Sequence, residues 1–149
     1  MPALVELCEL LGLGAFEMPV RTYQCFPMNH PLYQGASSPK ECDALLLLDV
    51  LVPWVPGPNA PGPEAYVAVV DTDPVKQKIP SYEFTADLRV TADPLLTIRA
   101  ITALARERLT PQDRERIAAR TGHWVEVSAK RRAAVEADAR SHAAATPIH

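Results

Sequence analysis

Hydrophobic and polar positions divide the first hundred residues into helical and extended segments. Residues 3–11 carry apolar side chains with a helical period and stop before Gly12, which predicts a short helix. Residues 15–20 are typical of a short strand. The nearly continuous apolar run ALLLLDVL, at residues 44–51, is typical of a strand buried on both faces, as in a parallel sheet that helices cover.

Two later extended segments end in the same way, with aspartate and proline. The β-branched and aromatic residues 66–70 precede Asp71 and Asp73, and a second short run ends at Asp93 and Pro94. Both residue types terminate strands and favour turns or helix starts. Pro94 suits the first position of a helix, with Asp93 as its N-cap. Each of these aspartates therefore has a structural explanation that needs no ligand.

The segments between these elements are rich in turn-forming residues. Residues 21–39 and residues 52–65 contain too much proline, glycine and serine for regular structure, although residues 39–43 can form a brief helix. No repeat is found along the chain.

The chain after Leu109 is charged and rich in alanine. One helix is expected to begin at Pro111 and to end at Gly122, and another is expected over residues 124–145. The second of these helices carries only a thin apolar stripe. The tail after Leu109 is therefore expected to dock weakly, or against a neighbouring chain.

Alternating helices and strands indicate an α/β fold with a parallel sheet flanked by helices. Ligands of such sheets bind at the C-terminal ends of the strands, where Asp49, Trp54, Asp71 and Asp73 are expected to lie. The chain starts in a helix and contains no G-x-G-x-x-G turn. The sheet is therefore expected to lack its first strand and the phosphate-binding turn that would follow it.

Composition narrows the class of protein. A length of 149 residues suits one domain, and 48% hydrophobic with 22% charged residues is globular composition. No apolar run reaches the ~18 residues of a membrane span, and the N-terminus does not resemble a secretory signal. Cys8, Cys25 and Cys42 lack the spacing of a zinc site or a disulfide framework, so a cytoplasmic protein with reduced thiols is expected. Cys25 with His30 is conceivable as a nucleophile pair, but no nucleophile motif accompanies it.

Charge is distributed unevenly along the chain. Residues 1–105 carry 6 basic and 12 acidic residues, whereas residues 106–149 carry 9 basic and 6 acidic ones. Trp124 is the only aromatic residue of the basic region that could stack on a base. The pattern favours a solvated helix face, so neither nucleic acid nor a membrane is expected as a partner.

Four segments together resemble a known family. They read HPLYQG at 30–35, DALLLLDVLVPWVP at 43–56, AYVAVVDTDP at 65–74, and KIPSYEFTADLRVTADP at 78–94. In order and spacing they resemble the central domain of thiamine-diphosphate-dependent enzymes of the acetolactate synthase-like group. The resemblance covers residues 3–109 and, more loosely, continues to residue 148. No one of the four segments is specific alone.

The resemblance implies a Rossmann-like six-stranded sheet and a middle position in a three-domain enzyme. Residues 1–109 would form the central domain, and residues 110–149 a helical linker toward a diphosphate-binding domain. In this family a pyrimidine-binding domain supplies the activating glutamate, and a GDG…N motif elsewhere binds magnesium and diphosphate. Neither pattern occurs here. The chain is therefore expected to be a central-domain fragment without catalytic or metal-binding residues, about one-quarter of a full enzyme.

Family members that bind flavin contact the nucleotide part of FAD with residues at the strand ends. Asp71, Asp73, Asp93 and Trp54 are the corresponding candidates for a nucleotide in this sequence. Flavin-dependent members typically place an Arg-Phe-Asp-type sequence where this chain has Trp54 and its two preceding residues, so a guanidinium for a phosphate is absent. Trp54 could stack on an adenine or simply pack over the sheet edge, and FAD and ADP remain alternative ligands.

The expected function is that of a scaffold within a thiamine-diphosphate- and magnesium-dependent lyase or transferase. Such an enzyme decarboxylates a 2-keto acid and passes the product carbanion equivalent to an acceptor. The chain alone is expected to be inactive, with other domains of its polypeptide as partners and weak homo-oligomerisation. The alternative is a free-standing nucleotide-binding or regulatory Rossmann-like module that holds ADP, NAD or a CoA moiety.

Overall fold

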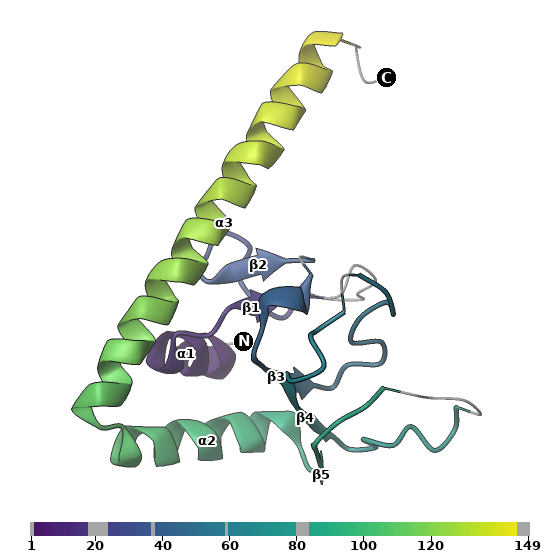
Figure 1. Ribbon diagram of the computed structural model, residues 1–149, viewed down its shortest axis with the longest axis vertical. Helices are drawn as coiled ribbons and strands as arrows, with labels where there is room; N and C mark the ends of the chain where they lie inside the picture. Colours follow the sequence, from purple (N-terminus) through teal and green to yellow (C-terminus); the bar gives the residue numbers. More distant parts are fainter. Residues whose placement is uncertain (1, 18–23, 37, 59, 80–83, 146–149) are drawn as a thin grey trace.

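The computed structural model describes residues 2–17, 24–36, 38–58, 60–79 and 84–145 (Figure 1). Its elements, in chain order, are α1 (Pro2–Leu11), β1 (Ala15–Phe16), β2 (Tyr33–Gly35), the 3-10 helix η1 (Pro39–Glu41), β3 (Ala44–Leu48), β4 (Tyr66–Asp71), β5 (Leu88–Thr91), α2 (Pro94–Arg108) and α3 (Pro111–Ala145). Among these residues no helix is long and apolar enough to cross a membrane.

All strand pairs are parallel, which confirms the predicted α/β class. β1 pairs with β2, and β3, β4 and β5 form a second sheet in that order. Leu45 pairs with Val67 and Leu48 with Val70, so the predicted parallel pairing of these two apolar strands is confirmed. In the described part of the chain the strands thus form two small sheets, not one continuous sheet.

Strand β3 is less buried than its apolar sequence predicted. Val67, Val69 and Val70 of β4 are buried, whereas Leu45 to Leu48 are only half-buried. β4 is the middle strand and is flanked by β3 and β5, but β3 lies at the edge of its sheet. An edge strand loses the cover that a neighbouring strand gives, and the sequence pattern does not distinguish an edge strand from a central one.

Strand β2 lies within a segment that was expected to be irregular. It is only three residues long, and a turn closed by Tyr33 N–H and the His30 carbonyl precedes it. All three of its residues are buried, between β1 and α3. Burial between β1 and α3 therefore stabilises this strand. The turn-forming residues around it are the reason that the sequence did not predict it. The rest of the strand predicted at 15–20 beyond β1 lies partly outside the described residues.

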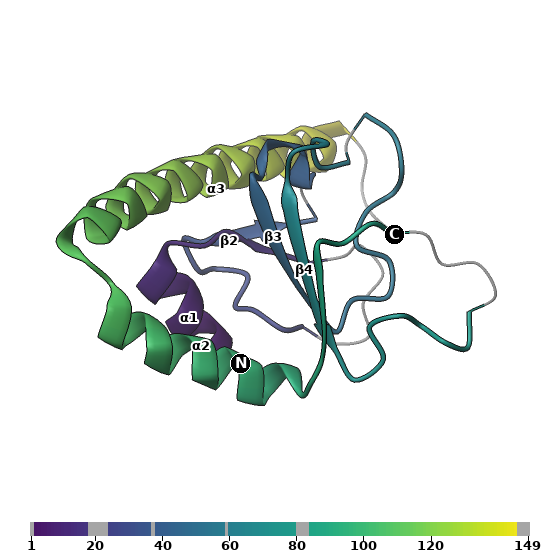
Figure 2. The same ribbon diagram turned by 60° about the horizontal axis from the view of Figure 1, so that its bottom comes forward.

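Two helices cover one side of the larger sheet. α2 packs against β4, and α1 packs along α2. The buried residues of α2 are Ile98 and Thr102. Figure 2 shows α1 and α2 on one side of β3 and β4, with the long loops on the other. As predicted, Asp93 caps α2, because its carboxylate accepts the Leu96 N–H at 2.9 Å.

Helix α3 continues through Gly122, so the prediction of two separate helices is wrong. A glycine inside a helix costs about 1 kcal/mol relative to alanine, which is too little to end a helix that is held on both sides. Arg120 donates from Nε to the Leu11 carbonyl at 3.2 Å, and Ser128 donates to the Tyr33 carbonyl at 2.9 Å. Docked residues on either side therefore keep Gly122 in the helix.

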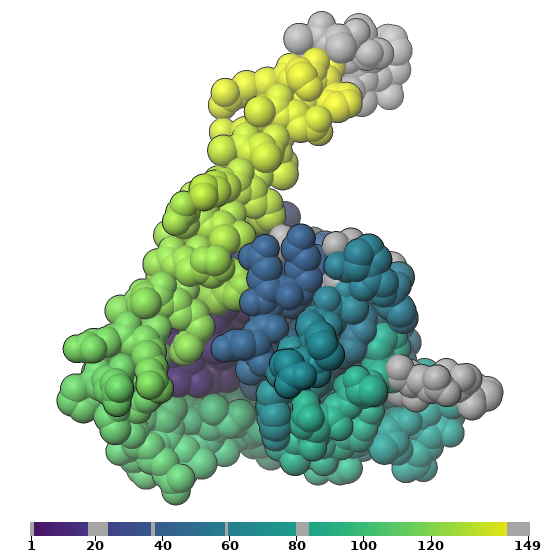
Figure 3. All heavy atoms as spheres, in the orientation of Figure 1, coloured from purple at the N-terminus to yellow at the C-terminus, as the bar shows by residue number. Residues whose placement is uncertain are grey.

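The tail after Leu109 was expected to dock weakly or on a neighbouring chain, and its residues up to Arg132 lie against the same chain. They dock through polar contacts and through Trp124 and Val125, which pack against a buried hydrophobic cluster. From Ala133 to His142 every residue is exposed, and this part of α3 stands clear of the remaining structure (Figure 3).

Gly12 allows α1 and α3 to approach closely. It ends α1 with a φ of 62°, and the bond from Leu13 N–H to the Cys8 carbonyl, at 2.9 Å, completes a Schellman motif. A Cβ at this position would lie 2.7 Å from the Ile117 carbonyl oxygen of α3. Both its conformation and its neighbour therefore require glycine.

Replacing Gly12 with alanine is expected to destabilise the fold by about 2 kcal/mol or more, from the left-handed conformation and the backbone clash together. The matched control is Gly122→Ala, where a Cβ meets nothing within 4 Å. That variant is expected to gain about 1 kcal/mol. Urea unfolding followed by circular dichroism measures both values. A loss of stability in Gly122→Ala would contradict the continuous helix.

Candidate functional site

The C-terminal ends of β3, β4 and β5 lie at one edge of the larger sheet, where ligands of parallel sheets bind. Asp49 directly follows β3, Asp71 ends β4, and Asp93 lies two residues after the end of β5. Asp49 has a positive φ of 51°, which is uncommon outside glycine and marks a sharp turn directly after the strand. The polypeptide therefore turns at an acidic residue after each of the three strands.

Asp71 is the most buried of these carboxylates, with 2% of the residue exposed. Its Oδ1 accepts the Asp73 N–H at 2.8 Å, and its Oδ2 forms an ion pair with the Lys76 ammonium, whose side chain is 12% exposed. Lys76 has a positive φ of 52°, which turns the chain back so that its side chain meets Asp71. Asp71 thus organises the turn that follows β4.

The environment of Asp71 favours its charged form. Burial by itself raises the pKa of this carboxyl. The hydrogen bond from Lys76, the backbone N–H groups of Asp73 and Thr72, and the Lys76 charge together outweigh burial, so the net effect lowers the pKa. A carboxylate held in this way is an acceptor at neutral pH and is unsuited to give a proton.

The other three candidates for nucleotide binding also have intramolecular contacts. Asp73 accepts the Gln77 N–H through Oδ2 at 3.0 Å, and its Oδ1 is buried without a hydrogen-bond partner in the described residues. Asp93 is occupied as the cap of α2. Trp54 packs edge-on against Phe84, with ring centroids 5.3 Å apart. Asp71 and Asp73 therefore lie on one turn, whereas Asp93 and Trp54 belong to separate structural contacts.

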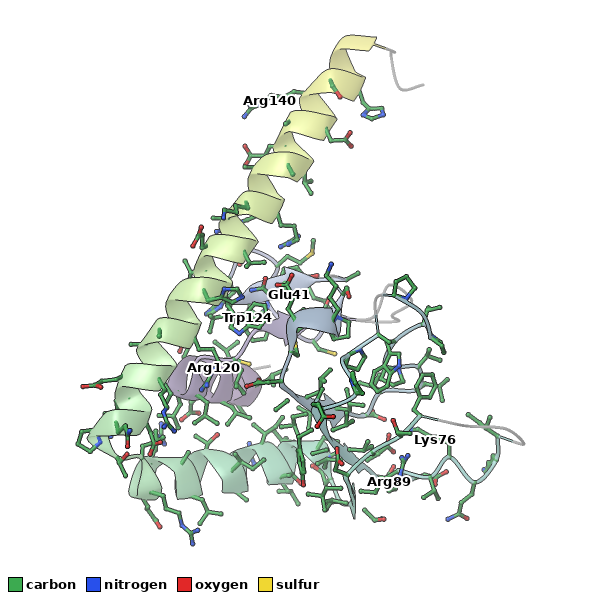
Figure 4. All side chains as sticks on the ribbon, viewed as in Figure 1. Glu41, Lys76, Arg89, Arg120, Trp124 and Arg140 are labelled. Carbon is green, nitrogen blue, oxygen red and sulfur yellow. The ribbon has the colours of Figure 1, made fainter. Side chains whose placement is uncertain are left out.

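Sequence reasoning did not identify the two cations of this region, Lys76 and Arg89 (Figure 4). Arg89 lies inside β5 and donates to the Pro74 carbonyl at 2.7 Å and to the Phe84 carbonyl. It thereby connects the loop after β4 to the segment before β5. The sequence did contain one indication of this role. Arg89 is a single charged residue in a short apolar strand, and a charge in such a strand needs a polar partner.

The described structure does not assemble a nucleophile from Cys25 and His30. The Nδ1 atom of His30 accepts the Leu32 N–H at 3.1 Å, and its Nε2 lies 3.2 Å from the Glu9 carboxylate. Both ring nitrogens are therefore used within the fold, and His30 orients the loop before β2.

The two other thiols are held in their protonated form. Burial, with a smaller contribution from the charge of Glu9, raises the pKa of Cys8 to about 12. Burial and the neighbouring acidic side chains raise the pKa of Cys42 to about 11. Since the thiolate is the reactive form, neither residue is suited to nucleophilic chemistry.

No group of three or more histidine, cysteine, aspartate or glutamate side chains able to hold a metal ion is found among the described residues. Comparison of the sequence with protein-family models, with well-characterised proteins and with solved structures finds no match.

Removing the Lys76 ammonium is expected to destabilise the fold strongly, because it leaves the buried Asp71 carboxylate without its cation. Lys76→Met is expected to cost about 3 kcal/mol, the range found when one partner of a buried ion pair is lost. The double variant Asp71→Asn/Lys76→Met is expected to recover part of this loss. Chemical unfolding of the wild type, both single variants and the double variant gives the coupling energy. Additive losses would show that the pair does not interact.

Stability is also expected to depend on acid through Asp71. Because its pKa is lower in the folded than in the unfolded chain, the ion pair stabilises the fold above the unfolded value of about 3.9. This contribution is lost as the pH falls through the lower, folded value. The free energy of unfolding of Asp71→Asn should therefore decrease less steeply than that of the wild type below about pH 4. Parallel slopes would exclude Asp71 as the titrating group.

Proposed function

We propose that this chain is the central, non-catalytic domain of a thiamine-diphosphate-dependent 2-keto acid decarboxylase or carboligase of the acetolactate synthase-like group. The observation that carries the proposal is the arrangement of three segments that resemble the family. They contain β3, β4 and β5, which are consecutive neighbours in one parallel sheet. A fold and a spacing that agree in this way support the resemblance more than any one motif does.

Within this proposal the domain acts as a scaffold. Polar side chains of β4, of β5 and of the turns after them are engaged inside the domain: Asp71 with Lys76, Asp93 with α2, and Arg89 with two loop carbonyls. Thiamine diphosphate, held by other domains, would supply the electron sink for decarboxylation. The residues of this chain would position the domains that hold the cofactor.

A free-standing nucleotide-binding module is the alternative function. Asp73 is the residue on which it depends, because one of its carboxylate oxygens has no partner in the described residues and a strand-end carboxylate suits a ribose hydroxyl. The coding sequence around residues 1–149 separates the two functions. A glutamate-bearing domain on one side and a GDG…N domain on the other, in the same reading frame, are expected from the first proposal. Their absence would favour the alternative.

The isolated chain is expected neither to bind thiamine diphosphate with magnesium nor to consume pyruvate, because no residue here is assigned to hold the cofactor. Isothermal titration with thiamine diphosphate and magnesium, and separately with ADP and FAD, measures binding. The control ligand is magnesium alone.

Micromolar binding of thiamine diphosphate would overturn the assignment of a non-catalytic domain. Binding of ADP that is lost in Asp73→Ala and kept in Asp49→Ala would favour the nucleotide-binding module, because both aspartates follow strands at the same edge.

A further inference from the structure

A pocket lies beside the smaller sheet, where Phe16 ends β1, away from the aspartates of β4 and β5. Its volume is about 190 Å³. Its lining includes Phe16 at the end of β1, Gln34 in the middle of β2, Lys40 and Glu41 of η1, and Trp124 and Val127 of α3. Pockets at the carboxyl ends of parallel strands are the usual ligand sites of α/β folds.

One wall of this pocket is aromatic and held in place. The rings of Phe16 and Trp124 meet edge to face, with centroids 5.4 Å apart. Gln34 is fully buried and donates from Nε2 to the Trp124 carbonyl at 3.0 Å and to the Leu32 carbonyl at 3.1 Å. The buried amide therefore fixes α3 against β2, so the wall exists before a ligand arrives.

The pocket is large enough for the body of a small organic molecule. A cavity of about 150 Å³ lined by apolar side chains accommodates benzene, and this pocket exceeds that volume. Phe16, Trp124 and Val127 offer apolar surface on which such a group would be removed from water.

Two opposite charges line the same pocket. Lys40 and Glu41 are adjacent on η1, which Ser38 caps by accepting the Lys40 N–H at 3.2 Å. Both side chains are exposed, and no hydrogen bond or ion pair is formed by either of them within the described residues. Figure 4 shows Glu41 on η1 beside Trp124 of α3.

We propose that this pocket binds a small zwitterion with an apolar body, of the class of an aliphatic α-amino acid. Its carboxylate would meet Lys40, its ammonium would meet Glu41, and its side chain would lie against Phe16 and Trp124. A simple anion would be opposed by Glu41 and a simple cation by Lys40, and a purely apolar ligand would gain nothing from either charge. This inference is independent of the function proposed for the domain.

L-Leucine titrated into Trp54→Phe, in which Trp124 is the remaining tryptophan, tests this proposal. A saturable change in Trp124 fluorescence is expected. Lys40→Gln and Glu41→Gln are each expected to weaken binding about fivefold, since an exposed charge pair contributes up to about 1 kcal/mol. The matched controls, Lys130→Gln and Glu136→Gln on the exposed side of α3, are expected to leave affinity unchanged.

Two analogues test the class of ligand. 3-Methylbutylamine lacks the carboxylate of leucine and 4-methylpentanoate lacks its ammonium, so both are expected to bind more weakly than leucine. NMR of the native chain, following the Trp124 indole N–H, gives the same readout if Trp54→Phe does not fold. No saturable change up to roughly 50 mM leucine, well above a dissociation constant near 1 mM, would overturn the proposal. Equal affinity for either analogue, or unchanged affinity in the Lys40→Gln/Glu41→Gln double variant, would also overturn it.

Discussion

The close approach of α1 and α3 at Gly12 is the contact on which the arrangement of the domain depends. A missing Cβ lets the Ile117 carbonyl of α3 come within van der Waals distance of the end of α1, and Arg120 then hydrogen-bonds the last carbonyls of α1. α1 also packs along α2, which covers the larger sheet. One short helix therefore connects the two sheets, because the smaller sheet lies against α3 and the larger one against α2.

Polar groups, together with the packing of Trp124 and Val125 against the buried cluster, hold α3 to the smaller sheet. Gln34 and Ser128 are both fully buried, and each bonds a backbone carbonyl of the opposite element. Arg131 adds a hydrogen bond to the Tyr33 carbonyl and lies over the Tyr33 ring at 5.2 Å. Buried hydrogen bonds are directional, so this interface specifies one register of the helix, whereas an apolar stripe would allow it to slide.

The features that were predicted correctly from sequence are those that local chemistry determines. The parallel pairing of β3 with β4 follows from two apolar β-rich runs, and the cap at Asp93 follows from the proline after it. The end of a helix at Gly122 was predicted wrongly, because distant contacts at Arg120 and Ser128 outweigh the local cost of glycine. The half-burial of β3 depends on strand order, which no local pattern records.

The residues of the candidate sites also differ in whether the local sequence predicts them. Asp71 and Asp73 were placed at a strand end because aspartate follows a β-rich run. The sequence does not predict that Lys76 is their partner. Lys76 lies five residues after Asp71, and its ammonium meets the Asp71 carboxylate because Lys76 itself has a left-handed backbone conformation. The pocket beside Trp124 could not be predicted for another reason. Its lining residues belong to β1, η1 and α3, which are far apart in the sequence.

The exposed C-terminal part of α3 differs from an isolated peptide helix in how it forms. An isolated helix of its length would be marginal in water, because the first turn must be ordered before any hydrogen bond is gained. Here the docked residues up to Arg132 provide that first turn, so residues 133–142 need only extend an existing helix. Melting of this segment should therefore proceed as gradual fraying toward Arg132, without a cooperative transition of its own.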